Sequence, residues 1–240
     1  MNTVTVNAST TYEVKIGSGL LPKLGAEVSA LGKAGKVCIV SDSNVWPLYG
    51  HAAKNSLENA GLEVIHFLFP AGESSKNCST YLQLLNFLAE NGMTRSDHLV
   101  ALGGGVVGDL TGFAAATYLR GIAYIQVPTT LLAMVDSSVG GKTGIDLKNG
   151  KNLAGAFYQP KLVLIDPETL KTLSDRVFSD GLAEVIKYGM IRDKKLFENS
   201  SLSVGRLDDA DFRLISEKLF SAEETPVRAA NPDATESARR

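Results

Sequence analysis

Short apolar runs alternate with amphipathic segments of helical length through the first 166 residues. The start is hairpin-like, with apolar and polar residues alternating at 3–6 and 12–16. Apolar or β-branched runs then follow at 36–42, 62–69, 98–104, 123–128 and 161–166, separated by helix-like stretches such as 44–60 and 77–91. This alternation predicts an α/β fold with a parallel sheet covered by helices on both faces.

The pattern changes at residue 167, where the strand-like runs stop. Residues 174–191, 193–200 and 209–220 have a helical apolar period. We therefore predict an α/β domain over 1–166 and the beginning of an all-helical domain over 167–220. Residues 221–240 are poor in large apolar side chains and lack periodicity, so we expect them to be disordered.

Composition narrows the class of ligand. The 24 Lys and Arg residues are balanced by 26 Asp and Glu, without a basic cluster interleaved with aromatics. This argues against a nucleic-acid partner and favours a small anionic ligand. The sequence shows neither a leader-like start nor an uncharged run of membrane-spanning length, so we expect a cytoplasmic protein without a membrane partner.

The two cysteines are far apart in the sequence. Cys38 and Cys78 have no C-x-x-C spacing and no histidine beside them, which argues against a disulfide framework and against a cysteine zinc site. We expect both to be small core residues.

Three glycines form a G-x-G-x-x-G spacing between an apolar run and a helix-like run. Gly103, Gly105 and Gly108 would let the backbone approach a pyrophosphate, and the N–H groups of residues 106–109 would face its charge. However, the motif follows the third strand of the alternating series, and no acidic residue closes a strand about 20 residues later. The spacing alone therefore remains weak evidence for a dinucleotide.

Acidic and basic residues follow the earlier strands instead. Asp42 ends the run at 36–42, beside Asn44, where a carboxylate suits either a ribose hydroxyl or the cap of the next helix. Glu73 and Lys76 follow the next strand, so they would reach the same edge of the sheet; otherwise they form an exposed ion pair.

The densest group of polar side chains lies between residues 126 and 157. Glycines interrupt this stretch, and we expect a ligand-binding loop rather than a regular helix or strand. Its lysines suit a phosphate or a carboxylate. The members of the group are Thr129, Thr130, Asp136, Lys142, Lys148, Lys151 and Asn152.

Glu184 and Lys187 are three residues apart in an otherwise apolar helical segment. This spacing places both on one helix face, where they form either an ion pair or part of a metal or ligand site.

Four motifs together resemble one enzyme family, the 3-dehydroquinate synthases. They are "GGGVVGDLTGFAAATYLRGI", "QVPTTLLAMVDSSVGGKTGID", "KNLAGAFYQP" and "GLAEVIKYGMI", and the resemblance extends over residues 1–215. It implies a Rossmann-like NAD-binding domain with its own strand order, followed by a helical domain for metal and substrate.

The resemblance also implies roles for individual residues. Lys142 is assigned to both cofactor and substrate, Arg120 to the substrate phosphate of a neighbouring subunit, and Glu184 to a zinc or cobalt ion. Further substrate contacts are Asp136, Asn152 and Lys187. The cofactor candidates are Asp42, Asn44, Glu73, Lys76, Gly104, Gly105, Val106, Val107, Gly108, Asp109, Thr129, Thr130, Lys142, Lys151, Thr169, Leu170, Lys171 and Thr172.

The implied reaction belongs to the shikimate route to aromatic amino acids. It starts from 3-deoxy-D-arabino-heptulosonate 7-phosphate: one ring carbon is oxidised by NAD⁺, phosphate is eliminated, the hydride is returned, and an aldol step closes the carbocycle. The metal would polarise the hydroxyl being oxidised. The family resemblance further implies a homodimer.

The sequence departs from the family at the metal. The family completes that site with two histidines, one in an "N-x-G-H-T-x-G-H"-like motif, and neither is present. His51, His66 and His98 lie in the α/β region without ligand spacing. We therefore expect a chain that is inactive by itself and is either truncated or frame-shifted near residue 220 or, alternatively, an evolved short form.

Two other functions compete with this one. The first is another sugar-phosphate cyclase, or a polyol dehydrogenase of the same broader fold. The second is a non-catalytic module that binds NAD or pairs subunits, suggested by the intact nucleotide motifs beside an incomplete metal site.

Overall fold

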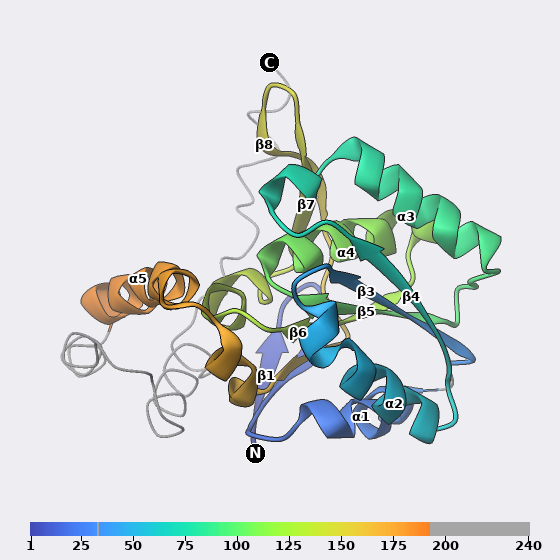
Figure 1. Ribbon diagram of the computed structural model, residues 1–240, viewed down its shortest axis with the longest axis horizontal. Helices are drawn as coiled ribbons and strands as arrows, with labels where there is room; N and C mark the ends of the chain where they lie inside the picture. The colour runs from blue at the N-terminus through green and yellow to red at the C-terminus, as the bar shows by residue number, and fades with distance from the viewer. Residues whose placement is uncertain (33, 193–240) are drawn as a thin grey trace.

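A computed structural model describes residues 1–32 and 34–192 of the chain (Figure 1). The predicted helices at 193–200 and 209–220 and the predicted disordered segment at 221–240 lie outside the described residues. The strands are β1 (Asn2–Asn7), β2 (Thr11–Ile16), β3 (Lys36–Asp42), β4 (Glu63–Phe69), β5 (His98–Gly103), β6 (Ala123–Pro128), β7 (Lys142–Leu147), β8 (Gly150–Phe157) and β9 (Leu162–Ile165).

The helices lie between these strands and after the last one. The α-helices are α1 (Leu24–Ala30), α2 (His51–Asn59), α3 (Cys78–Glu90), α4 (Gly105–Thr117) and α5 (Asp175–Arg192). Short 3-10 or π-helical segments are η1 (Leu21–Lys23), η2 (Trp46–Gly50), η3 (Glu73–Ser75), η4 (Tyr118–Arg120), η5 (Ala133–Ser137) and η6 (Pro167–Thr172).

Seven strands form one sheet in the order β1-β2-β9-β6-β5-β3-β4. β1 pairs antiparallel with β2, whereas every other pairing in this sheet is parallel. The predicted α/β fold with a parallel sheet is therefore confirmed.

Helices cover both faces of this sheet, as the continuous apolar strands require. In β5, Val100 and Leu102 pack in a cluster with residues of α1 and α2. Leu99 and Ala101 point to the other face and pack with residues of α3 and α4. Figure 1 shows the two helix pairs on opposite sides of the sheet.

The β1-β2-β9 end of the sheet is covered by η5 and α5. Met134 of η5 and Val185 of α5 are fully buried there, against β2 and β9. A Cβ on Gly181 would lie 2.6 Å from the Leu132 backbone N, so glycine lets α5 approach the segment after β6 closely. Met190 and Ile191, further along α5, are exposed.

The expectation of a loop without regular structure between β6 and β9 was wrong. Most of this stretch forms η5 and a separate antiparallel hairpin of β7 and β8. Gly144 and Gly155 face each other in it, and a Cβ on Gly155 would lie 2.1 Å from the Thr143 backbone O. The glycines thus permit unusually close strand pairing instead of preventing it.

The two cysteines differ in their exposure. Cys38 is buried as predicted, but Cys78 is exposed, since it opens α3 on its solvent side behind the capping residue Asn77.

Within residues 1–32 and 34–192, no helix combines the length and apolar character needed to cross a bilayer.

Gly112 tests how the β7–β8 hairpin is held against α4. In Gly112→Ala, the new Cβ would lie 2.3 Å from Thr143 Cγ2. Thr143 cannot easily withdraw, because its hydroxyl donates to the Ala156 backbone O at 2.8 Å. We expect the free energy of unfolding, measured by urea denaturation, to fall by about 1–3 kcal/mol.

Gly35→Ala is the matched control, because its nearest contact would be an ordinary 3.5 Å to Asp97 Oδ1. It should change the free energy of unfolding by less than about 0.5 kcal/mol. Equal stability of the two variants would contradict the proposed close contact.

Candidate cofactor and substrate site

The carboxyl ends of the parallel strands bring five chain segments to one edge of the sheet. These segments follow β3, β4, β5, β6 and β9, and this edge is where open α/β sheets bind ligands. They carry most of the cofactor candidates: Asp42, Asn44, Glu73, Lys76, Gly104–Asp109, Thr129, Thr130 and Thr169–Thr172.

The glycine loop leads directly from β5 into α4. Gly104 is the N-cap of α4 and provides no side-chain cap, so the first N–H groups of the helix face the sheet edge. Such an N-terminus binds anions through these N–H groups and the helix dipole. The structure thus has the backbone arrangement that the glycine motif predicts.

Packing also requires glycine in this motif. A Cβ on Gly104 would lie 3.1 Å from Thr130 Cγ2, and one on Gly108 would lie 2.7 Å from Gln126 Oε1. Larger residues would push α4 away from β6 and its following turn. The glycines of the motif therefore allow α4 to pack closely against β6 and leave the N-terminus of α4 open to a ligand.

Asp42 stabilises the turn after β3. Its Oδ1 accepts hydrogen bonds from the backbone N–H groups of Asn44 at 2.8 Å and Val45 at 2.9 Å. These bonds close the turn after β3 and fix the carboxylate at the sheet edge, whereas the N-cap positions of η2 and α2 are Val45 and Gly50, without a side-chain cap. A ribose contact stays a prediction.

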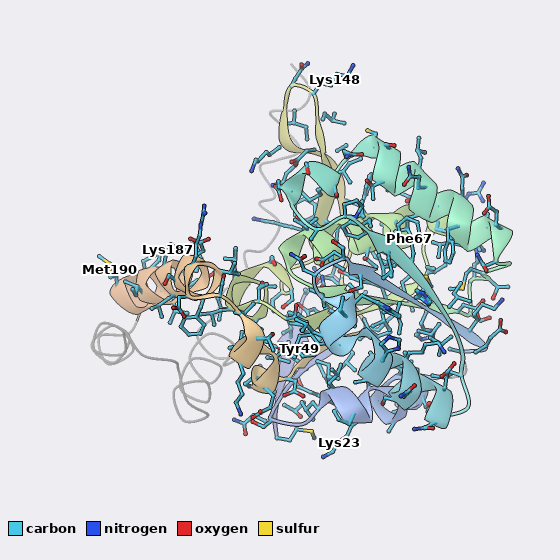
Figure 2. The ribbon with its side chains drawn as sticks, in the orientation of Figure 1. Lys23, Tyr49, Phe67, Lys148, Lys187 and Met190 are labelled. Carbon is cyan, nitrogen blue, oxygen red and sulfur yellow. The ribbon has the colours of Figure 1, made fainter. Side chains whose placement is uncertain are left out.

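Tyr49 joins the turn after β3 to the segment after β9. Its hydroxyl donates to the Thr169 backbone O at 2.8 Å and lies 2.5 Å from Thr172 Oγ1. Burial raises the pKa of Tyr49, so the hydroxyl stays protonated at neutral pH. The predicted cofactor segment 169–172 is thereby held next to η2 (Figure 2).

Lys76 is the centre of the charged part of the site. It is only 4% exposed. Its Nζ donates to Asn152 Oδ1 at 2.7 Å and to Asp109 Oδ2 at 3.1 Å. Carboxylate oxygens of Glu73 and Asp146 lie 3.5 and 3.9 Å away, so four chain segments meet at one ammonium group.

The charges around Lys76 determine its protonation. Burial alone lowers the pKa of Lys76, but the nearby Asp109, Glu73 and Asp146 carboxylates outweigh it and raise the pKa overall. Burial raises the pKa of Asp109, while Lys76 opposes that rise. The ammonium thus stays charged in the folded protein and keeps the Asp109 carboxylate paired.

The remaining lysines lie around this centre. Lys151 Nζ lies 3.4 Å from Glu73 Oε1, which ties β8 to η3. Lys142 begins β7 and is exposed. Lys148 is at the tip of the projecting hairpin, away from the sheet (Figure 2).

Helix α5 packs against η5, the segment that carries Asp136. The hydroxyl of Tyr188 donates to Asp136 Oδ1 at 3.0 Å, which connects α5 to η5. Glu184 forms an ion pair with Lys187, so the pairing alternative considered for these residues is present. Lys187 Nζ also lies 5.1 Å from the centre of the Tyr188 ring.

Arg120 lies at the other end of the sheet from the other candidate residues. It is exposed in η4 and precedes β6, whereas Thr129 follows β6. A strand of this length separates their ends by about 20 Å. Arg120 and the preceding Leu119 have φ values of 68° and 51°, a left-handed backbone that non-glycine residues rarely adopt.

Sequence reasoning missed three residues in this region. Tyr49, Asp146 and Tyr188 each link two segments that are distant in sequence. Their spacing gave no signal, because each contact depends on how strands and helices pack. The sequence pointed only to candidates near them in the chain, namely Asn44, Asn152 and Lys187.

Comparison with known proteins identifies similar sequences. A family model described as 3-dehydroquinate synthase N-terminal matches residues 66–180. The 3-dehydroquinate synthase of Streptococcus suis (strain 05ZYH33) is 53% identical over 196 residues, covering 81% of this chain and 55% of that protein. The 3-dehydroquinate synthase of Pelobacter propionicus is 47% identical over 241 residues, covering 100% of this chain and 67% of that protein.

A solved structure is similar as well. The 2-epi-5-epi-valiolone synthase of Streptomyces hygroscopicus, determined with NAD⁺ and Zn²⁺ bound, superposes with a TM-score of 0.79 at 30% identity. The match covers 90% of this chain and 61% of that one. The chain thus spans between about half and two thirds of the length of these relatives.

Replacing Lys76 tests the buried charge network. Lys76→Met leaves the Asp109 carboxylate without its 3.1 Å partner, so we expect the free energy of unfolding at neutral pH to fall by about 3 kcal/mol. Burial then raises the pKa of Asp109 further. The folded state therefore binds the proton more tightly than the unfolded state, and the loss should shrink as pH falls through that pKa.

Urea denaturation at several pH values measures both effects. Lys148→Met is the control, since that side chain is exposed at the tip of the β7–β8 hairpin, and its effect should stay below about 0.5 kcal/mol. A Lys76→Met deficit that is equally large at acidic pH would refute the pairing with Asp109.

Proposed function

The chain belongs to the 3-dehydroquinate synthase family, and we propose that it provides the NAD⁺-binding part of an enzyme that converts 3-deoxy-D-arabino-heptulosonate 7-phosphate to 3-dehydroquinate and phosphate. This proposal rests mainly on one structural observation. The N-terminus of α4 opens at the carboxyl edge of the parallel sheet, next to the buried Lys76–Asp109 pair. A dinucleotide with an anionic pyrophosphate suits this arrangement.

The cofactor is assigned to the segments at the sheet edge. When bound, NAD⁺ supplies a hydride acceptor that is restored within one turnover. The N–H groups from Gly105 onwards would bind the pyrophosphate, and Asp42 would bind a ribose. Thr129, Thr130 and Thr169–Thr172 would line the same edge, with Tyr49 holding the last segment in place. The NAD⁺ bound by the valiolone synthase supports this assignment.

The substrate is assigned to the side of the site formed by the hairpin and α5. Lys142 lies on β7 and Lys187 on α5, and their charges suit the phosphate and carboxylate of a sugar acid. Asn152 is fixed beside Lys76, and Asp136 is held by Tyr188. These residues would orient the substrate against the cofactor.

A metal ion does not fit the described residues. Glu184 offers one carboxylate, already paired with Lys187. A catalytic zinc takes about three protein ligands. No group of three potential ligands gathers within residues 1–32 and 34–192, and the chain's three histidines, His51, His66 and His98, lie on α2, β4 and β5. Glu184 therefore remains a candidate for a single metal ligand.

The family resemblance also suggests how Arg120 is used. Its position before β6, about 20 Å from the residues that follow this strand, favours a contact with a second copy of the chain. We place it at the substrate phosphate of a second copy in a homodimer, in the cytoplasm. The left-handed backbone at Leu119 and Arg120 is the kind of strain that functional positions retain.

NAD⁺ affinity tests the proposed cofactor site. The 240-residue chain should bind NAD⁺ in isothermal titration calorimetry. Gly105→Val should weaken binding about tenfold or more, because its side chain would cover the first N–H groups of α4. Gly35→Ala, distant from this edge, should bind as the parent does. A folded parent chain that does not bind NAD⁺ would overturn the proposal.

Phosphate release tests catalysis. We expect this chain, supplied with NAD⁺, zinc and the heptulosonate phosphate, to release no phosphate, since residues 1–32 and 34–192 bring too few metal ligands together. A colorimetric phosphate assay would show this, and steady release would contradict it.

Calorimetry with a panel of sugar phosphates, in the presence of NAD⁺, separates this function from that of other cyclases and of polyol dehydrogenases.

A further inference from the structure

Asn152 has a strained backbone at a position that the proposed function uses. Its φ is 57°, in the left-handed region, which costs a non-glycine residue some conformational energy. Asparagine tolerates this conformation better than most residues. Even so, neighbouring groups must hold it there.

Asp146 provides that support. Its Oδ1 accepts a hydrogen bond from the Asn152 backbone N–H at 2.8 Å. The pairing of β7 and β8 is irregular between Ile145 and Leu147, so that Asp146 is opposite a bulged stretch of β8. The carboxylate thus replaces the ladder hydrogen bond that regular pairing would give Asn152.

The backbone of Asp146 is anchored on the opposite side. Its N–H donates to the Lys76 backbone O at 2.8 Å, and Asn77 and Asp146 form an isolated parallel bridge. Asp146 therefore connects the segment before α3 to β8. Its carboxylate also lies 3.9 Å from Lys76 Nζ and adds to the negative charge around that group.

These contacts converge on the side chain of Asn152. With its backbone held in the left-handed conformation, the amide Oδ1 accepts from Lys76 Nζ at 2.7 Å. Lys76 in turn donates to Asp109 in the first turns of α4. A change at Asp146 is thus expected to disturb Asn152, Lys76 and Asp109 together.

We propose that Asp146 is a positioning residue that holds Asn152 in its left-handed conformation and so sets the Lys76–Asp109 pair at the N-terminal part of α4. This inference rests on the proposed function, because it assumes that these residues line the NAD⁺ site. Asp146 acts through its neighbours and does not itself touch the ligand.

Three variants of the 240-residue chain test this role. Asp146→Ala removes the acceptor. Asp146→Asn keeps an oxygen that can accept from Asn152 but loses the charge. Asn149→Ala, at the exposed turn of the same hairpin, is the control. Amide hydrogen exchange of Asn152, followed by NMR, reports the hydrogen bond, and calorimetry reports the dissociation constant for NAD⁺.

In Asp146→Ala, the Asn152 amide should exchange about tenfold faster or more, and NAD⁺ should bind about tenfold more weakly, as loss of a hydrogen bond to a charged acceptor implies. Asp146→Asn should restore both values to within about threefold, and Asn149→Ala should match the parent in both.

Unchanged exchange in Asp146→Ala would overturn the inference, and so would faster exchange with unchanged NAD⁺ affinity. A folded parent chain that fails to bind NAD⁺ would instead overturn the proposed function, and with it the positioning role.

Discussion

The site depends on the requirement that the buried ammonium of Lys76 be neutralised. A charge removed from water is tolerated only when it is paired and hydrogen-bonded. Lys76 meets this requirement with Asp109 on α4, Glu73 on η3 and Asp146 on β7, and with the amide of Asn152 on β8. Because these groups belong to separate elements, the same pairing fixes the hairpin against the helix that opens the proposed cofactor site.

Close backbone packing is the second condition for the site. Gly108 and Gly112 let α4 approach Gln126 of β6 and Thr143 of β7, and Gly144 and Gly155 let the hairpin strands pair tightly. Side chains at these positions would force the facing groups apart. The glycines therefore bring the charged groups of the Lys76 network within hydrogen-bonding distance.

On the other side, α5 is positioned by the contact of Gly181 with Leu131 and Leu132 and by the Tyr188–Asp136 hydrogen bond. This arrangement places Glu184 and Lys187 near η5, where their ion pair forms. Arg120 precedes β6 and therefore lies at the opposite edge of the sheet from the segments that follow β3, β4, β5, β6 and β9.

The local pattern of the sequence determined the alternation of strands and helices. The strands at 36–42 and 123–128 have the predicted bounds, and the glycine motif begins a helix, because apolar periodicity and glycine conformation act over a few residues. The strand order, the β7–β8 hairpin and the roles of Tyr49, Asp146 and Tyr188 were decided only by the tertiary structure. Each depends on contacts between distant segments, such as Asp146 with Lys76 and Asn152, and local spacing carries no information about which segments will meet.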